Sequence, residues 1–209
     1  MSLQVDHTVT SGTFSLDGQT FDVDNNVWVL GDEDECIVID APHNPDAIMD
    51  LVGDRTLSAI VCTHAHDDHV EVAPDVADRT GAPILLHPHD RVLWDMTHPD
   101  RAPDGDLTDG QKLDVAGETV TVIHTPGHAP GAVCLHVPSL GVLFSGDTLF
   151  NGGPGATGRS YSDYDTILRS ISQRLFTLPD ATRVLTGHGQ ETTIGAERPS
   201  YDDWVAQGE

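Results

Sequence analysis

Histidine and aspartate residues stand where several apolar segments of this chain end. The first such segment, residues 59–62, runs directly into Thr63-His64-Ala65-His66-Asp67-Asp68-His69, which contains an H-x-H-x-D-H motif. Further along, His128, Asp147 and His188 each follow an apolar run and stand among glycines. Loops at strand ends are where folds place chemically active groups, and glycine permits the tight turns and close backbone approach that this requires. The pattern therefore predicts a fold in which several strands end beside one site.

The residue types in this pattern favour a pair of metal ions. In extended chain, His64 and His66 project on the same side, and a following turn lets Asp68 and His69 address a second point nearby. One loop can thus supply two ligands to each of two adjacent ions. The remaining ligands must come from the three later positions. Imidazole together with carboxylate suits zinc, iron or manganese.

The rest of the chain alternates between strand and helix patterns. The first 40 residues read as a meander of antiparallel strands, because apolar and polar residues alternate between glycines. Asn44 and Pro45 open a short helix that Gly53 closes, and apolar spacing over residues 164–176 predicts another. Residues 97–112 are rich in Pro, Asp and Gly and read as a loop. Strands followed by helices therefore occur twice, before and after this loop.

Length and charge narrow the class of protein. A chain of 209 residues with no internal repeat or boundary signal is expected to form a single domain over residues 1–209. Its 10 basic and 34 acidic residues give a formal net charge of −24, which argues against nucleic acid as a partner. No apolar run is long enough for a membrane helix, and the first residues have no apolar core typical of a secretory signal. We therefore expect a cytoplasmic protein with neither nucleic acid nor a membrane as its partner.

Four motifs occur in the order found in a known family. Thr63-His64-Ala65-His66-Asp67-Asp68-His69, Thr125-Pro126-Gly127-His128, Ser145-Gly146-Asp147-Thr148-Leu149-Phe150 and Thr186-Gly187-His188-Gly189 span most of the chain. With them the chain resembles the metallo-β-lactamase superfamily, and within it the glyoxalase II-like thioester hydrolases. The resemblance implies an α+β fold, a four-layer αββα sandwich with its site at one edge.

The same resemblance assigns roles to seven residues. By that likeness the first ion is held by His64, His66 and His128, and the second by Asp68, His69 and His188, while Asp147 bridges both. Two divalent ions are implied, zinc first, with iron or manganese as alternatives. The reaction implied is cleavage of a small acyl-thioester by a metal-bridging hydroxide, with Asp68 as the catalytic residue that orients the nucleophile.

Substrate recognition is expected near Arg159. Residues 152–160 resemble the family's G-x-G-R-[ST] loop in expanded form, so Arg159 could hold a carboxylate of the substrate or lock the loop by an ion pair. Tyr161 is a candidate for the pocket wall. Full-length glyoxalase II enzymes carry a further helical domain with basic groups for glutathione, whereas this chain ends soon after His188 and has Lys112 as its only lysine. We therefore expect a different cellular thiol as the acyl carrier.

Other activities stay open at this stage. A persulfide dioxygenase-like enzyme with one iron keeps most of the H-x-H-x-D-H loop, and a lactonase or β-lactamase has a related site. A non-catalytic binding module would usually have lost a ligand. The other histidines are expected to be ordinary surface or core residues. His87 and His89 alternate like a ligand pair, but no strand-end partner completes them in the sequence.

Overall fold

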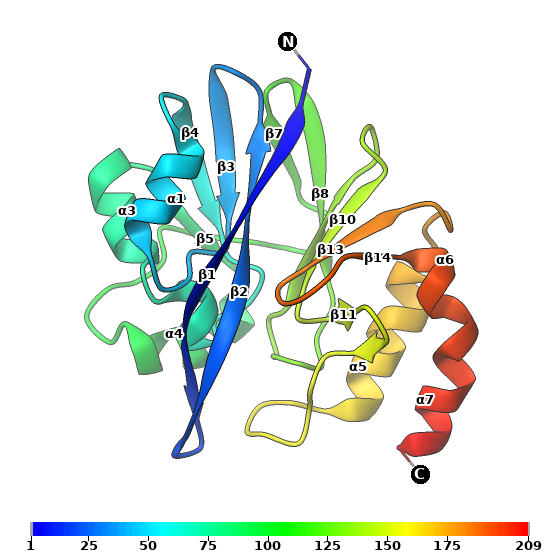
Figure 1. The fold of residues 1–209 in the computed structure, drawn as a ribbon. Coiled ribbons are helices and arrows are strands. Elements are labelled where there is room, and N and C mark those ends of the chain that lie inside the picture. Colours follow the sequence, from blue (N-terminus) through cyan, green and yellow to red (C-terminus); the bar gives the residue numbers. More distant parts are fainter. Residues whose placement is uncertain (1, 209) are drawn as a thin grey trace.

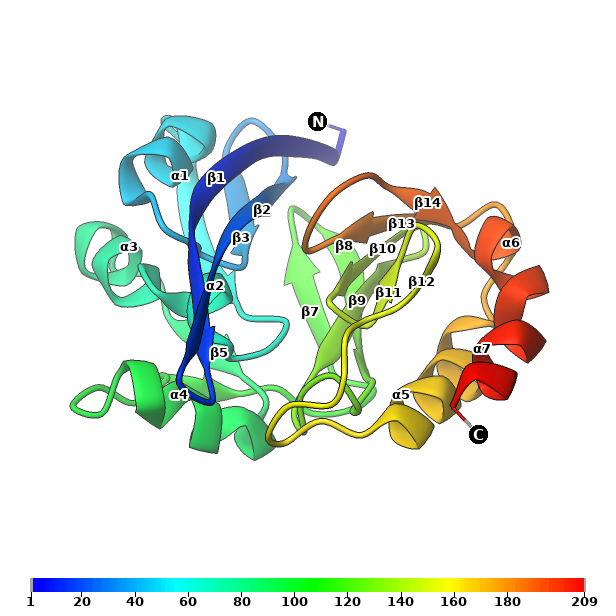
Figure 2. The same cartoon turned by 60° about the horizontal axis from the view of Figure 1, so that its bottom comes forward.

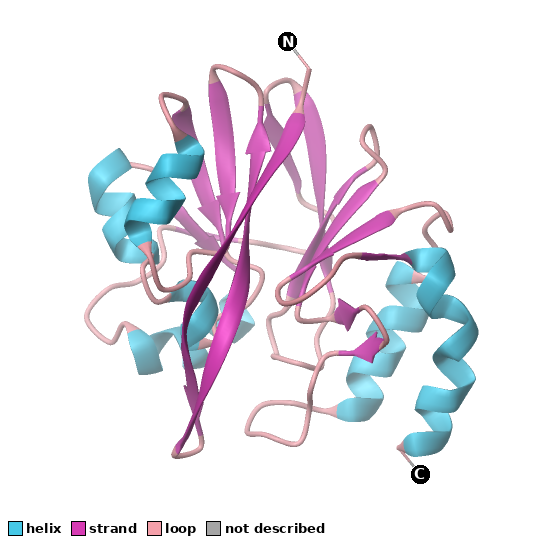
Figure 3. Cartoon of the chain, in the orientation of Figure 1, coloured by secondary structure: helices cyan, strands magenta, loops and turns pink. Residues whose placement is uncertain are grey.

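Two six-stranded β-sheets face each other and are covered on their outer sides by helices (Figure 1). The computed structural model describes residues 2–208. Figure 3 shows the layers in section: helices, sheet, sheet, helices, from one side of the molecule to the other. This is the predicted αββα sandwich, and its halves follow the two runs of strands and helices in the sequence.

The first sheet has the strand order β1-β2-β3-β4-β5-β6. The first three strands pair antiparallel, as the meander predicted, and the last four run parallel. A chain reversal at residues 17 and 18 joins β1 and β2 into a long hairpin that extends beyond the other strands (Figure 1). In the turned view of Figure 2, the tip of this hairpin lies over α4. The strands are β1 Gln4–Leu16, β2 Gln19–Gly31, β3 Glu35–Ile39, β4 Thr56–Val61, β5 Ile84–Leu86 and β6 Gly105–Asp106.

The second sheet has the order β14-β13-β10-β9-β8-β7. Only the pair β10 and β13 is parallel, and the other neighbours are antiparallel. A separate two-stranded pair, β11 and β12, lies in the loop that follows β10. The strands are β7 Lys112–Val115, β8 Glu118–His124, β9 Val133–Val137, β10 Val142–Gly146, β11 Leu149–Phe150, β12 Gly153–Pro154, β13 Arg183–Thr186 and β14 Thr192–Thr193.

Helices divide between the two outer faces. Those of the first half are α1 Pro45–Val52, α2 Asp67–Val70, α3 Ala73–Thr80, the 3-10 turn η1 Pro88–Asp90 and α4 Arg91–Thr97. Those of the second half are α5 Tyr164–Ser170, the π-helical turn η2 Ile171–Leu175, α6 Ile194–Glu197, the 3-10 turn η3 Arg198–Ser200 and α7 Tyr201–Gln207. In the described residues, no helix is both long and apolar enough to cross a membrane.

Strands buried on both faces hold these layers together. In β3, Cys36 and Val38 pack with the helices α1, α3 and α4, whereas Ile37 and Ile39 join the cluster between the two sheets. Successive side chains of a strand point to opposite faces, so a continuous apolar run buries both faces at once. A third cluster fills the space between the second sheet and its helices. Three apolar layers thus fix how the strand ends meet.

Local signals account for some elements and not for others. Asn44 caps α1 by accepting hydrogen bonds from two backbone N–H groups, and Gly53 ends it at a φ of 64°, as predicted. The loop predicted over 97–112 begins at the last residue of α4 and ends at the first residue of β7, and between them it holds only the two-residue strand β6. Helix α4 was not predicted, because its burial of Leu93 and Trp94 is set by contact with the first sheet.

Candidate metal centre

The seven predicted ligands come from loops that follow four strands. His64 and His66 follow β4, and the short helix α2 then carries Asp68 and His69. The other three residues stand after β8, β10 and β13 of the second sheet, and they are His128, Asp147 and His188. All seven are buried except His188, which is partly exposed. The structure therefore brings together every residue of the predicted set, while their binding of metal stays a prediction.

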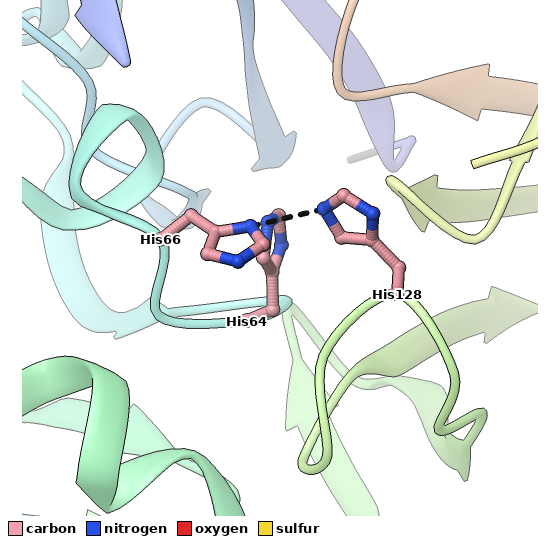
Figure 4. A group of neighbouring side chains, drawn as sticks. All are labelled: His64, His66 and His128. Atoms are coloured by element: carbon pink, nitrogen blue, oxygen red, sulfur yellow. Dashed lines mark hydrogen bonds between the residues drawn. The ribbon is translucent and has the colours of Figure 1, made fainter. Parts of the chain in front are cut away.

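Three histidines form the first group. One ring nitrogen from each of His64, His66 and His128 lies within 4.8 Å of the others. Figure 4 shows the rings turned toward one another, with His66 Nδ1 and His128 Nε2 at 3.0 Å. The Nε2 atoms of His64 and His66 are buried and have no hydrogen-bond partner among the described residues. Buried polar atoms normally have partners, so these two nitrogens fit the role of metal ligands.

The second group combines one carboxylate with two imidazoles. Asp68, His69 and His188 again have ligand atoms within 4.8 Å of one another. His69 Nε2 lies 3.2 Å from His188 Nε2, and Asp68 Oδ2 lies 3.3 Å from the same His188 atom. The turn that α2 makes directly after His66 is what separates these ligands from the first group.

Asp147 lies between the two groups. Its Oδ2 is 3.5 Å from His128 Nε2 in the first group and 3.3 Å from His188 Nε2 in the second. Its Oδ1 is 3.3 Å from His69 Nε2 but has no hydrogen-bond partner in the described chain. A carboxylate so placed can contact ions in both groups. Gly187 permits this approach, because a Cβ there would clash with Asp147 Oδ1 and with His69.

Hydrogen bonds fix the orientation of three histidine rings. The Nδ1 atom of His69 donates to Asp40 Oδ2 at 2.8 Å, that of His128 to the Ala156 carbonyl at 2.7 Å, and that of His188 to the Asp24 carbonyl at 2.8 Å. Each bond leaves Nε2 facing the site. Metal-binding histidines usually have such a partner for the other ring nitrogen.

Two supporting residues were not predicted from the sequence. Asp40 stands directly after β3 at a φ of 60°, and its carboxylate accepts hydrogen bonds from Thr63 as well as from His69. A carboxylate after a buried strand is the same signal that marked the other loops. Asn25 donates from Nδ2 to Asp68 Oδ2 at 3.0 Å. It lies inside the long strand β2, where the sequence gives no such signal.

Comparison with known proteins decides the family. Residues 20–188 match the family model described as the metallo-beta-lactamase superfamily. The chain belongs to the metallo-beta-lactamase superfamily. The matched residues contain all four ligand loops and every strand of both sheets except β1, β14 and the first residue of β2.

Relatives of this superfamily member include enzymes and a metal-bound structure. The chain is 30% identical over 187 residues to the probable metallo-hydrolase YqgX of Bacillus subtilis, covering 83% of this chain and 89% of that protein. It is 36% identical over 185 residues to a hydroxyacylglutathione hydrolase of Aeromonas salmonicida, covering 85% of this chain and 65% of that enzyme. The solved structure of TTHA1623 in a di-iron-bound form is 31% identical, with a TM-score of 0.76, over 84% of this chain and 93% of that one. At the level of class, this superfamily member is therefore a metal-dependent hydrolase.

The two groups of this superfamily member differ in their protonation. Burial, and after it the charge of His69, lowers the pKa of His64 well below its ordinary value. Burial, and then the neighbouring His128, lowers the pKa of His66 to about 3. Burial also opposes protonation of His188, but the Asp147 carboxylate outweighs it and raises that pKa to about 10. The first group therefore offers neutral imidazoles at pH 7, and an ion entering the second displaces protons.

In this member of the metallo-beta-lactamase superfamily, a cavity of about 210 Å³ opens onto the candidate metal centre. The hairpin contributes Phe14, Phe21 and Val23 to its lining, together with five of the predicted ligands. Arg159 also lines it, as predicted, with its guanidinium 5.2 Å from the centre of the Phe14 ring and 4.6 Å from that of Phe21. Tyr161 does not line it: the residue is 48% exposed, and its φ of 69° belongs to the turn of the loop.

Proposed function

We propose that this chain hydrolyses a small acyl-thioester at two divalent ions held by the seven ligands, with zinc first and iron or manganese as alternatives. The observation that carries the proposal is the position of Asp147 between two complete groups of ligand atoms. When bound, two such ions supply Lewis acidity and lower the pKa of a shared water toward neutrality. The similarity to a hydroxyacylglutathione hydrolase supports thioester cleavage, and the similarity to a di-iron structure supports the pair of ions.

The chain's own residues orient the reactants. Asp68 is the proposed catalytic residue, since its Oδ2 faces His188 and is held from behind by Asn25. A carboxylate fixed at that point can accept a hydrogen bond from the attacking water and so orient it toward the carbonyl. Phe14 and Phe21 cover the cavity and exclude bulk water from the acyl group.

The surroundings of Arg159 support the proposal that the substrate is anionic. The Nη1 atom of this arginine is buried and has no hydrogen-bond partner in the described chain, and no carboxylate of residues 2–208 forms an ion pair with it. The alternative role considered from the sequence, in which Arg159 fixes its own loop through an ion pair, is therefore not seen in the described residues. Arg159 is half-buried, and a guanidinium without a carboxylate partner can bind a carboxylate of the substrate in a bidentate manner. The small cavity favours a short acyl group.

The acyl carrier is proposed to be a thiol other than glutathione. Arg159 is the only lysine or arginine among the residues that line the cavity in the described chain, whereas glutathione carries two carboxylates. The net charge of −24 further opposes nucleic acid and anionic membrane surfaces as partners. We also propose a cytoplasmic location, since the three cysteines are buried and unpaired, as in a reducing compartment.

The decisive test is a substrate panel under one metal loading. We expect kcat/KM for small acyl-thioesters to exceed kcat/KM for a lactone, a β-lactam and a persulfide, and S-lactoylglutathione to saturate weakly. If a lactone or β-lactam exceeded every thioester by more than about tenfold, which corresponds to about 1.4 kcal/mol in transition-state binding, the thioesterase proposal would be wrong. Oxygen-dependent turnover of a persulfide by protein with one iron would point to the dioxygenase instead.

A further inference from the structure

Three histidines outside the metal centre also lie together. His87, His89 and His124 each offer a ring nitrogen within 4.8 Å of the others. The rings of His87 and His124 stack at 4.1 Å with an angle of 11°, and the His89 ring stands edge-on to both. His124 is thus the strand-end partner that the sequence did not reveal, because it comes from a strand of the other sheet.

The three residues are fixed by the fold. His87 is buried after β5, His89 is exposed within η1, and His124 is the last residue of β8. The Nε2 atom of His124 donates to the Pro130 carbonyl at 3.0 Å, which leaves Nδ1 with a free lone pair. This backbone partner is the arrangement common behind metal-binding histidines. His87 Nδ1 accepts from the His89 backbone at 3.3 Å, a long bond that competes weakly with an ion.

Charges around the cluster favour a cation. A cavity of about 180 Å³ adjoins His87 and is also lined by Asp106, which forms no ion pair with the described residues. The arginine that lines the same cavity, Arg91, is paired with Asp95. Three imidazoles with a nearby carboxylate form a donor set that suits zinc among the available divalent ions.

We propose that His87, His89 and His124 form a separate zinc site that links the two halves of the sandwich. Two ligands belong to the segment after β5 of the first sheet, and the third belongs to β8 of the second. None of the three lines the cavity at the metal centre. An ion bound here would therefore act on stability and not on turnover. It would hold the loop between His124 and His128 against η1.

The number of bound ions tests this proposal directly. Holoprotein carrying its resident metals is titrated with zinc alone, and bound zinc is counted for wild type, His89→Ala and His124→Ala. We expect wild type to bind one more zinc than either variant. His136→Ala is the matched control, because His136 lies in the same sheet but belongs to no group of potential ligands in the described chain. It should bind as many ions as wild type.

Thermal unfolding provides an independent readout. Added zinc should raise the Tm of wild type and of His136→Ala, and should leave the Tm of His89→Ala unchanged. His89 is exposed, so this variant keeps its fold even if His124→Ala does not. Thioester turnover of His89→Ala should equal that of wild type, which separates this site from the metal centre. Equal zinc counts and equal Tm shifts in wild type and His89→Ala would overturn the proposal.

Discussion

At the scale of single residues, Asp147 differs from the other predicted ligands because it contacts both groups. Burial raises the pKa of its carboxyl, but the charges of His69 and His188 outweigh burial and hold that pKa well below its usual range. The carboxylate is therefore ionised throughout the physiological range and can offer an oxygen to each ion. Among the predicted ligands, in contrast, His188 contacts only Asp147 and the other members of the second group.

This difference predicts unequal effects on metal content. Asp147→Ala should lower occupancy at both positions, because it removes a ligand from each. His188→Ala should mainly weaken the second position and leave the first filled. Elemental analysis of protein purified without chelator measures both, with wild type expected to hold two ions per chain. Equal, independent losses in the two variants would contradict the assignment.

Arg159 gives a second prediction at this scale. If its unpaired Nη1 holds an anionic group, Arg159→Ala should raise KM about tenfold or more with little change in kcat, because uniform binding is lost. Arg159→Lys keeps the charge but not the bidentate geometry, so its KM should lie between those of wild type and Arg159→Ala. Steady-state kinetics on one anionic and one neutral thioester provide the comparison. A loss of folding stability with unchanged KM would show a structural role.

Which site residues the sequence could predict depends on how local their signals are. The H-x-H-x-D-H motif was informative because four ligands sit on one short loop, where spacing alone sets their directions. Asn25 and Asp40, in contrast, lie 43 and 29 residues away in the sequence from their partners Asp68 and His69. Tyr161 was predicted to line the pocket because it is close to Arg159 in the sequence, but the positive φ of Tyr161 turns the backbone there.

At the scale of elements, one buried carboxylate ties together three loops. Asp90, at the end of η1, accepts the backbone N–H of Ala65 at 2.8 Å and also that of Gly131. It therefore links η1 to the loop that carries His64 and His66, and to the loop that follows His128. Burial raises the pKa of Asp90 to about 7, against the two N–H donors that lower it.

The raised pKa predicts a pH-dependent contribution to stability. A carboxyl whose folded pKa lies above its unfolded value binds its proton more tightly when folded, so stability falls as pH rises from about 4 to about 7. Asp90→Asn cannot ionise and lacks this dependence, although it loses one acceptor at every pH. The unfolding free energy of the variant relative to wild type should therefore rise by up to about 4 kcal/mol across that range. Denaturant unfolding at equal metal loading measures it, and a constant difference would contradict the shift.

The sequence predicted the elements whose boundaries are set by local caps and by alternation. It did not predict the features that depend on packing. Helix α1 begins and ends at residues whose side chains or φ angles make the boundary. The segment 164–176 shows helical spacing, yet it changes from α-helix to a π-helical turn after Ser170. Nothing in apolar spacing distinguishes these two, because both bury the same face against the second sheet.

At the scale of the whole molecule, the metal centre lies where the ends of both sheets meet. Buried carboxylates and imidazoles are concentrated there, and they are costly to bury without a cation. Removing the ions with a chelator should therefore lower the Tm. If the ions are present at about a thousand times their Kd, the loss is about 4 kcal/mol, or roughly 10 °C for a chain of this size. Thermal scans with and without chelator measure it, and an unchanged Tm would mean that no ion was bound.

Each predicted group draws its ligands from both halves of the sandwich. His64 and His66 precede the loop at residues 97–112 and His128 follows it, and Asp68 and His69 are likewise separated from His188. During synthesis, the first group cannot be completed before residue 128 has been made, and the second cannot be completed before residue 188 has been made. Binding of both metal ions is then one of the last steps in the folding of a newly synthesised chain. Both ions can therefore be bound only after the two halves have assembled, because no unfinished chain can present the full set of ligands.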